Sequence, residues 1–146
     1  MTMLKNNRAN STEWAIENGW LTDVEIQPSS HFEPRDKNES ISLLVVHNMQ
    51  YVSFNDKAWH AGVSRYQERD KCNDFSIGIE LEGTDDIPYT KEQYQQLSQL
   101  SRALIAAYPA LQNNIVGHCD IAPGRKTDPG ISFDWQCYRA LLAENG

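Results

Sequence analysis

The sequence predicts an α/β fold in a single domain, and three observations lead to that prediction. Apolar, β-branched segments alternate along the chain with amphipathic segments of helical period, as expected when helices pack on a sheet. The 146 residues suffice for one core of modest size but not for two. No internal repeat or low-complexity segment interrupts the pattern. We expect a loose tail over residues 1–11 and one domain over residues 12–146.

Two segments are the strongest strand candidates. Residues 41–47 are apolar at almost every position, which predicts a strand that is buried on both faces and ends at His47. Residues 75–82 alternate in character, with isoleucine and leucine on one face and serine, glycine and glutamate on the other. Acidic side chains opposite an apolar face suggest a pocket. Shorter strands are expected at residues 51–54 and 115–118.

Three helices are expected. A short one over residues 12–18 would end at Gly19 as a left-handed cap. The clearest begins at the capping box of Thr90 and Gln93, continues with apolar residues at helical spacing, and stops at Pro109. The last covers residues 133–142.

Composition excludes several classes of function. The net charge of −7 has the wrong sign for binding nucleic acid, and no basic stripe offsets it. The polar first residues contain no apolar stretch that could span a membrane or direct secretion, so we expect a cytoplasmic protein. Three widely spaced cysteines suggest neither a disulfide framework nor a thiolate zinc site, and we expect buried free thiols.

Two histidines and one aspartate form a candidate metal site. His47 and His118 each end a predicted strand, where open α/β sheets place their sites, and Asp128 follows in a loop. Two imidazoles and a carboxylate suit Zn²⁺ and leave a fourth position open for catalysis. The alternative is two ordinary strand-end histidines and an aspartate that caps a turn. The residues alone leave both interpretations open, because the spacing matches no compact metal motif.

Four strings carry a family resemblance: residues 44–48, 58–64, 73–84 and 117–130. Together they closely resemble the zinc-dependent type 2 N-acetylmuramoyl-L-alanine amidases, especially the cytoplasmic enzymes that cleave 1,6-anhydro-muramyl peptides in cell-wall recycling. The resemblance implies a mixed central β-sheet flanked by helices, as in peptidoglycan-recognition proteins. It also implies a muropeptide substrate, one zinc ion and no obligate protein partner.

The resemblance implies a role for each candidate catalytic residue. His47, His118 and Asp128 would bind zinc, Glu80 would be the general acid and base, and Lys126 would stabilise the developing oxyanion. The simpler interpretations are an ion-paired strand-end acid for Glu80 and a solvated surface lysine for Lys126. Glu82, on the same face of the strand, is the second choice for the acid.

Four further residues match positions in or near the family's substrate groove. Asn48, Trp59 and His60 would hold sugar and peptide, although Trp59 could equally pack in the core. Lys71 stands where close relatives usually carry an arginine associated with the peptide carboxylate. Because lysine cannot form the same bidentate pair, substrate affinity is expected to be weaker here.

The chain departs from the family after Met49. Relatives have several dozen residues between the first histidine strand and the string that matches residues 50–55, and here the two are joined directly. We therefore expect a shortened amidase, in which the strand ending at His47 finds a new neighbour or leaves a bare edge. Three hypotheses follow: an active zinc amidase, a non-catalytic muropeptide-binding domain, and a misfolded remnant.

Overall fold

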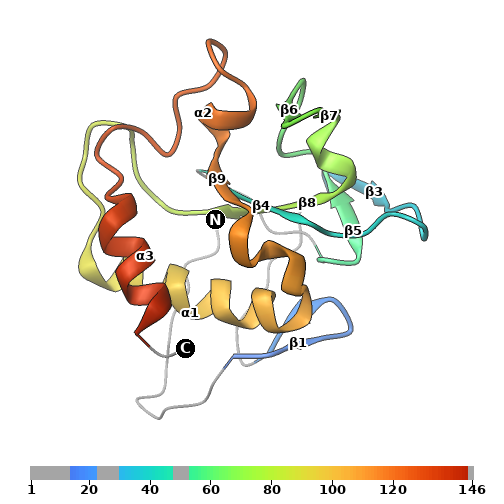
Figure 1. Ribbon diagram of the computed structural model, residues 1–146, viewed down its shortest axis with the longest axis horizontal. Coiled ribbons are helices and arrows are strands. Elements are labelled where there is room, and N and C mark those ends of the chain that lie inside the picture. Colours follow the sequence, from blue (N-terminus) through green and yellow to red (C-terminus); the bar gives the residue numbers. More distant parts are fainter. Residues whose placement is uncertain (1–13, 23–29, 48–52, 145–146) are drawn as a thin grey trace.

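A three-stranded parallel sheet lies at the centre of the molecule (Figure 1). The computed structural model describes residues 14–22, 30–47 and 53–144. Strand β4 (Leu43–His47) pairs with β8 (Ser76–Glu80) on one side and with β9 (Ile115–Gly117) on the other. The strand that ends at His47 therefore leaves no bare edge. The α/β prediction is confirmed, but all described strands of the central sheet are parallel, and the antiparallel pairs form separate ribbons.

Both faces of β4 are covered, as its apolar sequence predicts. Leu44 and Val46 belong to a core cluster with helix α1, whereas Leu43 and Val45 belong to a second cluster on the opposite face. All five residues of β4 are buried. Parallel sheets typically bury both faces in this way. The predicted alternation along β8 is also present. Its residues Ile77 and Ile79 face the α1 side.

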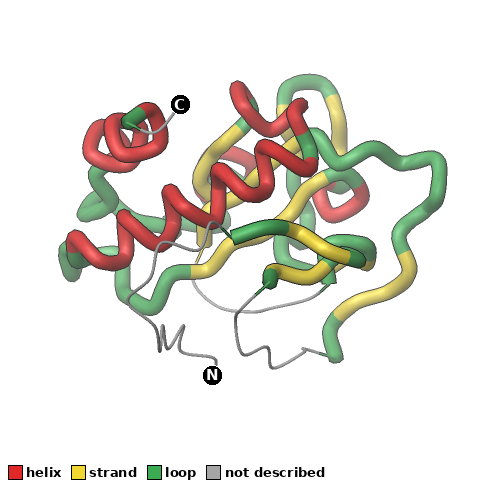
Figure 2. The backbone as a smooth tube through the Cα atoms, turned by 90° about the horizontal axis from the view of Figure 1, so that it is seen from below, coloured by secondary structure: helices red, strands yellow, loops and turns green. Residues whose placement is uncertain are grey.

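Helices α1 (Lys91–Ala107) and α3 (Trp135–Ala143) lie together on one side of the sheet (Figure 1). Figure 2 shows α1 as the long helix across the front of the molecule. Five aromatic rings from these helices and from the segments that precede them pack against one another, with centroid separations of 4.8–6.2 Å in edge or tilted contacts. They are Tyr89, Tyr94, Phe133, Trp135 and Tyr138. No helix in the described ranges is long and apolar enough to cross a membrane.

The predicted capping box at the start of α1 is present. The Thr90 hydroxyl accepts from the backbone N–H of Gln93 at 3.2 Å, and the Gln93 side chain accepts from the Thr90 N–H at 2.8 Å. Thr90→Ala should lower the free energy of unfolding by about 1 kcal/mol, measured by urea denaturation. Thr90→Ser keeps the hydroxyl and should stay close to wild type. Equal stability of all three proteins would contradict this account of the cap.

Short elements surround the central sheet. Their bounds are β3 (Phe32–Pro34), β5 (Asp56–Ala58), β6 (Arg65–Tyr66), β7 (Arg69–Asp70), η1 (Cys72–Asp74), η2 (Pro109–Asn113) and α2 (His118–Ile121). Strands β3 and β5 form one antiparallel pair, and β6 and β7 form another. The cysteines are free thiols as expected, but only Cys72 is fully buried.

The segment around Gly19 differs from the predicted short helix. Strands β1 (Ile16–Glu17) and β2 (Trp20–Leu21) form a hairpin, and its turn residues Asn18 and Gly19 have φ values of 52° and 80°. Positive φ at both positions is the requirement of a type I′ hairpin turn, for which Asn-Gly is the preferred pair. The predicted strand at 51–54 is also wrong at its described end, since Ser53 and Phe54 precede β5. The expected tail over residues 1–11 lies outside the described residues.

Candidate metal centre and active site

The candidate ligands meet at the carboxyl edge of the central sheet. His47 is the last residue of β4, and His118 follows β9 directly as the first residue of α2. Glu80 ends β8 in register with His47. Because parallel strands end at the same edge, residues far apart in the sequence become neighbours there.

Three side chains converge as the sequence predicted. The Nδ1 atoms of His47 and His118 lie 3.0 Å apart. Asp128 Oδ2 lies 3.1 Å from His118 Nδ1 and 3.6 Å from His47 Nδ1. Their ligand atoms all lie within 4.8 Å of one another, a span that one metal ion can bridge. Both histidines are buried and the aspartate is partly buried.

The pKa shifts of His118 and Asp128 favour the binding of a divalent cation. Burial lowers the pKa of His118, with a further contribution from the His47 ring, so this imidazole is neutral at neutral pH. Burial raises the pKa of Asp128, but the adjacent His47 and His118 rings outweigh this effect and lower that pKa to about 2. Neutral imidazoles and an ionised carboxylate are the forms that bind Zn²⁺, so the donor set fits the ion.

Glu80 has the environment of a general base. Its Oε2 atom is buried and has no hydrogen-bond partner among the described residues. Burial and the nearby charge of Asp128 raise its pKa to about 7, from an ordinary value of 4.5. A carboxyl group with this pKa can both accept and release a proton near neutral pH. Glu82, the second choice, is exposed, which favours Glu80 for the role.

Lys126 lies on the exposed loop between α2 and Asp128. Its backbone N–H donates to the Ala122 carbonyl at 3.0 Å, so the backbone of this loop turns back on α2. The neighbouring Arg125 was not singled out from the sequence. Its Nη2 donates to the carbonyls of Ala61 at 2.6 Å and Val63 at 2.8 Å. Arg125 therefore connects the loop that carries Asp128 with the segment that contains Trp59 and His60 by hydrogen bonds.

The residues predicted to bind substrate have different surroundings. The exposed fraction of Trp59 is 54%, so this ring is accessible to a ligand and is not part of the core. Both ring nitrogens of His60 are engaged within the protein, Nδ1 with His47 and Nε2 with Ser76. Lys71 is exposed and has a left-handed backbone (φ 60°) just before η1. Asn48 lies outside the described residues.

The family comparison agrees with this geometry. Residues 4–131 match the model of the N-acetylmuramoyl-L-alanine amidase family. The 1,6-anhydro-N-acetylmuramyl-L-alanine amidase AmpD of Salmonella typhimurium strain SL1344 is 44% identical over 176 residues, covering 87% of this chain and 94% of that protein. The AmpD of Escherichia coli K12 is 42% identical over 178 residues, covering 88% and 97%.

The first of these alignments also bears on the length of the chain. Its 176 aligned positions exceed the 146 residues of this chain by 30, so the relative carries at least 30 residues without a counterpart here. This agrees with an internally shortened amidase. The position of the gap, after Met49, stays a prediction.

Solved structures show the same similarity. The crystal structure of a selenomethionine AmpD derivative superposes with a TM-score of 0.84 at 44% identity, covering 88% of this chain and 99% of that one. A complex of the E. coli amidase AmiD with anhydro-N-acetylmuramic acid-L-Ala-D-γ-Glu-L-Lys superposes with a TM-score of 0.58 at 28% identity, covering 88% and 65%. The chain therefore belongs to the N-acetylmuramoyl-L-alanine amidase family.

Proposed function

We propose that this chain is a zinc-dependent amidase that cleaves the bond between 1,6-anhydro-N-acetylmuramic acid and L-alanine in cell-wall recycling. The observation that carries the proposal is the convergence of His47, His118 and Asp128 at one edge of the sheet, with Glu80 beside them. The relatives named for this reaction supply the substrate class. A cytoplasmic location and the absence of an obligate protein partner rest on the resemblance alone.

The proposed chemistry divides between the ion and the side chains. Bound Zn²⁺ would lower the pKa of a water molecule to about 7 and polarise the amide carbonyl. His47, His118 and Asp128 would hold the ion. Glu80 would accept a proton from the attacking water and pass it to the leaving amine of L-alanine, for which a pKa of about 7 is well matched. The Lys126 ammonium would stabilise negative charge on the carbonyl oxygen.

Substrate binding is proposed for Asn48, Trp59, His60 and Lys71. The exposure of Trp59 leaves its ring face free to pack on a sugar or peptide. Because both nitrogens of His60 are already engaged, His60 would contact substrate only through its ring carbons. The exposed Lys71 ammonium could pair with a peptide carboxylate as a single point charge.

A second candidate function is a muropeptide-binding domain without turnover. The observation that favours it is the absence of at least 30 residues present in the AmpD relative, because a lost groove segment could leave substrate poorly oriented. In this case the protein would bind anhydromuramyl peptide, measurable by calorimetry, and release no product. A misfolded remnant would instead show no cooperative thermal unfolding.

Mass spectrometry of the reaction products tests these alternatives. Purified protein is incubated with anhydromuramyl-tripeptide as isolated, after chelation, and after zinc is restored. We expect free tripeptide in the first and third samples and none in the second. Release that persists after complete removal of metal would refute the zinc mechanism. Binding without release under all three conditions would establish the recognition domain instead.

A further inference from the structure

One short segment contacts both histidine ligands on the side of the ring that faces away from the other ligands. The segment consists of His60 and Ala61, in the loop after β5. His60 Nδ1 lies 2.7 Å from His47 Nε2. The Ala61 carbonyl lies 3.3 Å from His118 Nε2. In each ligand histidine the contacted nitrogen is Nε2, and the nitrogen that points to the other ligands is Nδ1.

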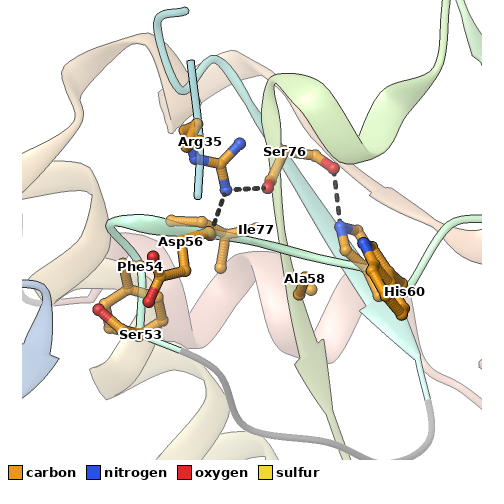
Figure 3. A pocket seen from close by; sticks show the side chains of 10 residues that line it. Arg35, Ser53, Phe54, Asp56, Ala58, His60, Ser76 and Ile77 are labelled. Atoms are coloured by element: carbon orange, nitrogen blue, oxygen red, sulfur yellow. Dashed lines mark hydrogen bonds between the residues drawn. The ribbon is translucent and has the colours of Figure 1, made fainter. Parts of the chain in front are cut away.

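Ser76 determines which nitrogen of His47 carries the proton. The Ser76 hydroxyl donates its only hydrogen to the Cys72 carbonyl at 2.5 Å, so towards His60 it can only accept. His60 Nε2 must therefore be the donor in the 2.9 Å contact drawn in Figure 3. In a neutral ring this leaves His60 Nδ1 as an acceptor, which must receive its hydrogen from His47 Nε2. His47 Nδ1 is then left with a bare lone pair.

The Ala61 carbonyl has the same effect on His118. A carbonyl oxygen can only accept, so His118 Nε2 must carry the hydrogen in this contact, and in a neutral ring Nδ1 then has the lone pair. The lone pairs of both histidines therefore point towards the Asp128 carboxylate, from ring nitrogens only 3.0 Å apart. Three electron-rich atoms at such distances repel one another unless a proton or a metal ion lies among them.

The surroundings hold this segment in place. The Ala61 N–H donates to the Asn73 side-chain oxygen at 2.7 Å, and Arg125 donates to the Ala61 carbonyl at 2.6 Å. Gly78 of β8 leaves the room that the two rings need. A Cβ atom at this position would lie 2.8 Å from His60 Nδ1 and 2.9 Å from His47 Nε2, closer than van der Waals contact allows.

We propose that His60, Ser76 and the Ala61 carbonyl are positioning groups of the metal centre, which hold His47 and His118 in the Nε2–H tautomer so that both Nδ1 atoms face the ion. The inference rests on the proposed zinc site. It gives the two ring nitrogens of His60 the support of a ligand, and leaves only the ring carbons for contact with substrate. Outer partners of this kind typically change metal affinity by about 10- to 100-fold.

Nuclear magnetic resonance tests the tautomers directly, without activity. Long-range ¹H–¹⁵N correlations of the ring nitrogens are recorded on uniformly labelled full-length protein, metal-free at a pH where the rings are neutral and again with zinc bound. We expect the Nε2–H pattern for both His47 and His118 in the two samples. An Nδ1–H pattern at either residue, or zinc coordination through Nε2, would overturn the proposal.

A pair of serine variants tests the effect on the ion. Ser76→Ala removes the hydroxyl that makes His60 Nε2 a donor and His60 Nδ1 an acceptor. The variant should bind zinc about 10-fold or more weakly, as measured by competition with a chromophoric chelator. Ser98→Ala is the matched control, because Ser98 is also buried and its hydroxyl donates to the Gln95 carbonyl within α1, away from the metal centre. Its zinc affinity should equal that of wild type. Equal affinity of all three proteins would overturn the proposal.

Gly78→Ala provides an independent variant that keeps every polar group. Its methyl group should separate His60 from His47 and weaken zinc binding in the same direction as Ser76→Ala. Thermal unfolding of each variant separates loss of the ion from loss of the fold. If wild-type protein binds no zinc at all, the proposed function fails. The tautomers of the metal-free protein still decide this inference in that case.

Discussion

Glu80→Gln should lower the turnover number by roughly 10²- to 10⁴-fold while zinc content stays at the wild-type level. The amide of glutamine keeps the size of the side chain but cannot accept the proton of the attacking water. The rate is measured as release of tripeptide, and zinc is measured by atomic absorption. Glu82→Gln, a matched change at an exposed position two residues beyond the end of β8, should retain most activity. The reverse ranking of the two variants would assign the base to Glu82.

The pH profile of wild type should report the same carboxyl group. Because burial and Asp128 raise the pKa of Glu80 to about 7, the base is increasingly protonated below that pH. The turnover number should therefore fall by about tenfold per pH unit on the acid side of the profile. The residual activity of Glu80→Gln should lack this limb. If the wild-type turnover number fell only near pH 4.5, the ordinary carboxyl pKa, the proposed effect of burial on Glu80 would be wrong.

A raised carboxyl pKa also has a cost in stability, with a defined sign. The stabilising contribution of protonated Glu80 is complete below the unfolded-state pKa near 4.5 and is lost as pH rises through about 7. At pH 8 the metal-free Glu80→Gln variant should thus be more stable than wild type by about 1–2 kcal/mol, after allowance for solvent screening of a partly exposed group. The difference should vanish near pH 4, as measured by urea denaturation.

Asp128→Asn should lower zinc affinity by more than about 100-fold. Loss of an outer hydrogen-bond partner costs up to about that factor, and this change removes the anionic ligand itself. Turnover should fall with zinc occupancy. Asp134→Asn is the matched control, since Asp134 caps α3 by accepting from Cys137 and asparagine can do the same. Its zinc affinity and rate should match those of wild type.

Thermal unfolding gives a second measurement of the Asp128 variant that does not depend on substrate. Zinc at 100 times its dissociation constant should stabilise wild type by about 2.7 kcal/mol. The same zinc concentration should leave the unfolding temperature of Asp128→Asn almost unchanged. An equal zinc-induced shift in both proteins would show that the ion binds elsewhere.

Local sequence patterns determined most of the central architecture. The apolar run of β4, the alternation of β8 and the capping box of α1 each predict an element whose core the structure retains, with ends no more than two residues away. Such patterns succeed because periodicity and capping depend on neighbours in the chain. The hairpin turn at Asn18 and Gly19 also has a local signal, the Asn-Gly pair. The prediction made from the sequence assigns Gly19 to a helix cap instead.

The sequence predicts the metal ligands and the acid and base through the family resemblance of the strings around His47, Glu80 and Asp128. Only the folded chain shows what surrounds these residues. The pKa of Glu80 depends on burial and on a carboxylate 48 positions away in the chain. The roles of Ser76, Arg125 and the Ala61 carbonyl depend on donors and acceptors that only the folded sheet edge brings together. Such environments are properties of distance and desolvation, which no local pattern encodes.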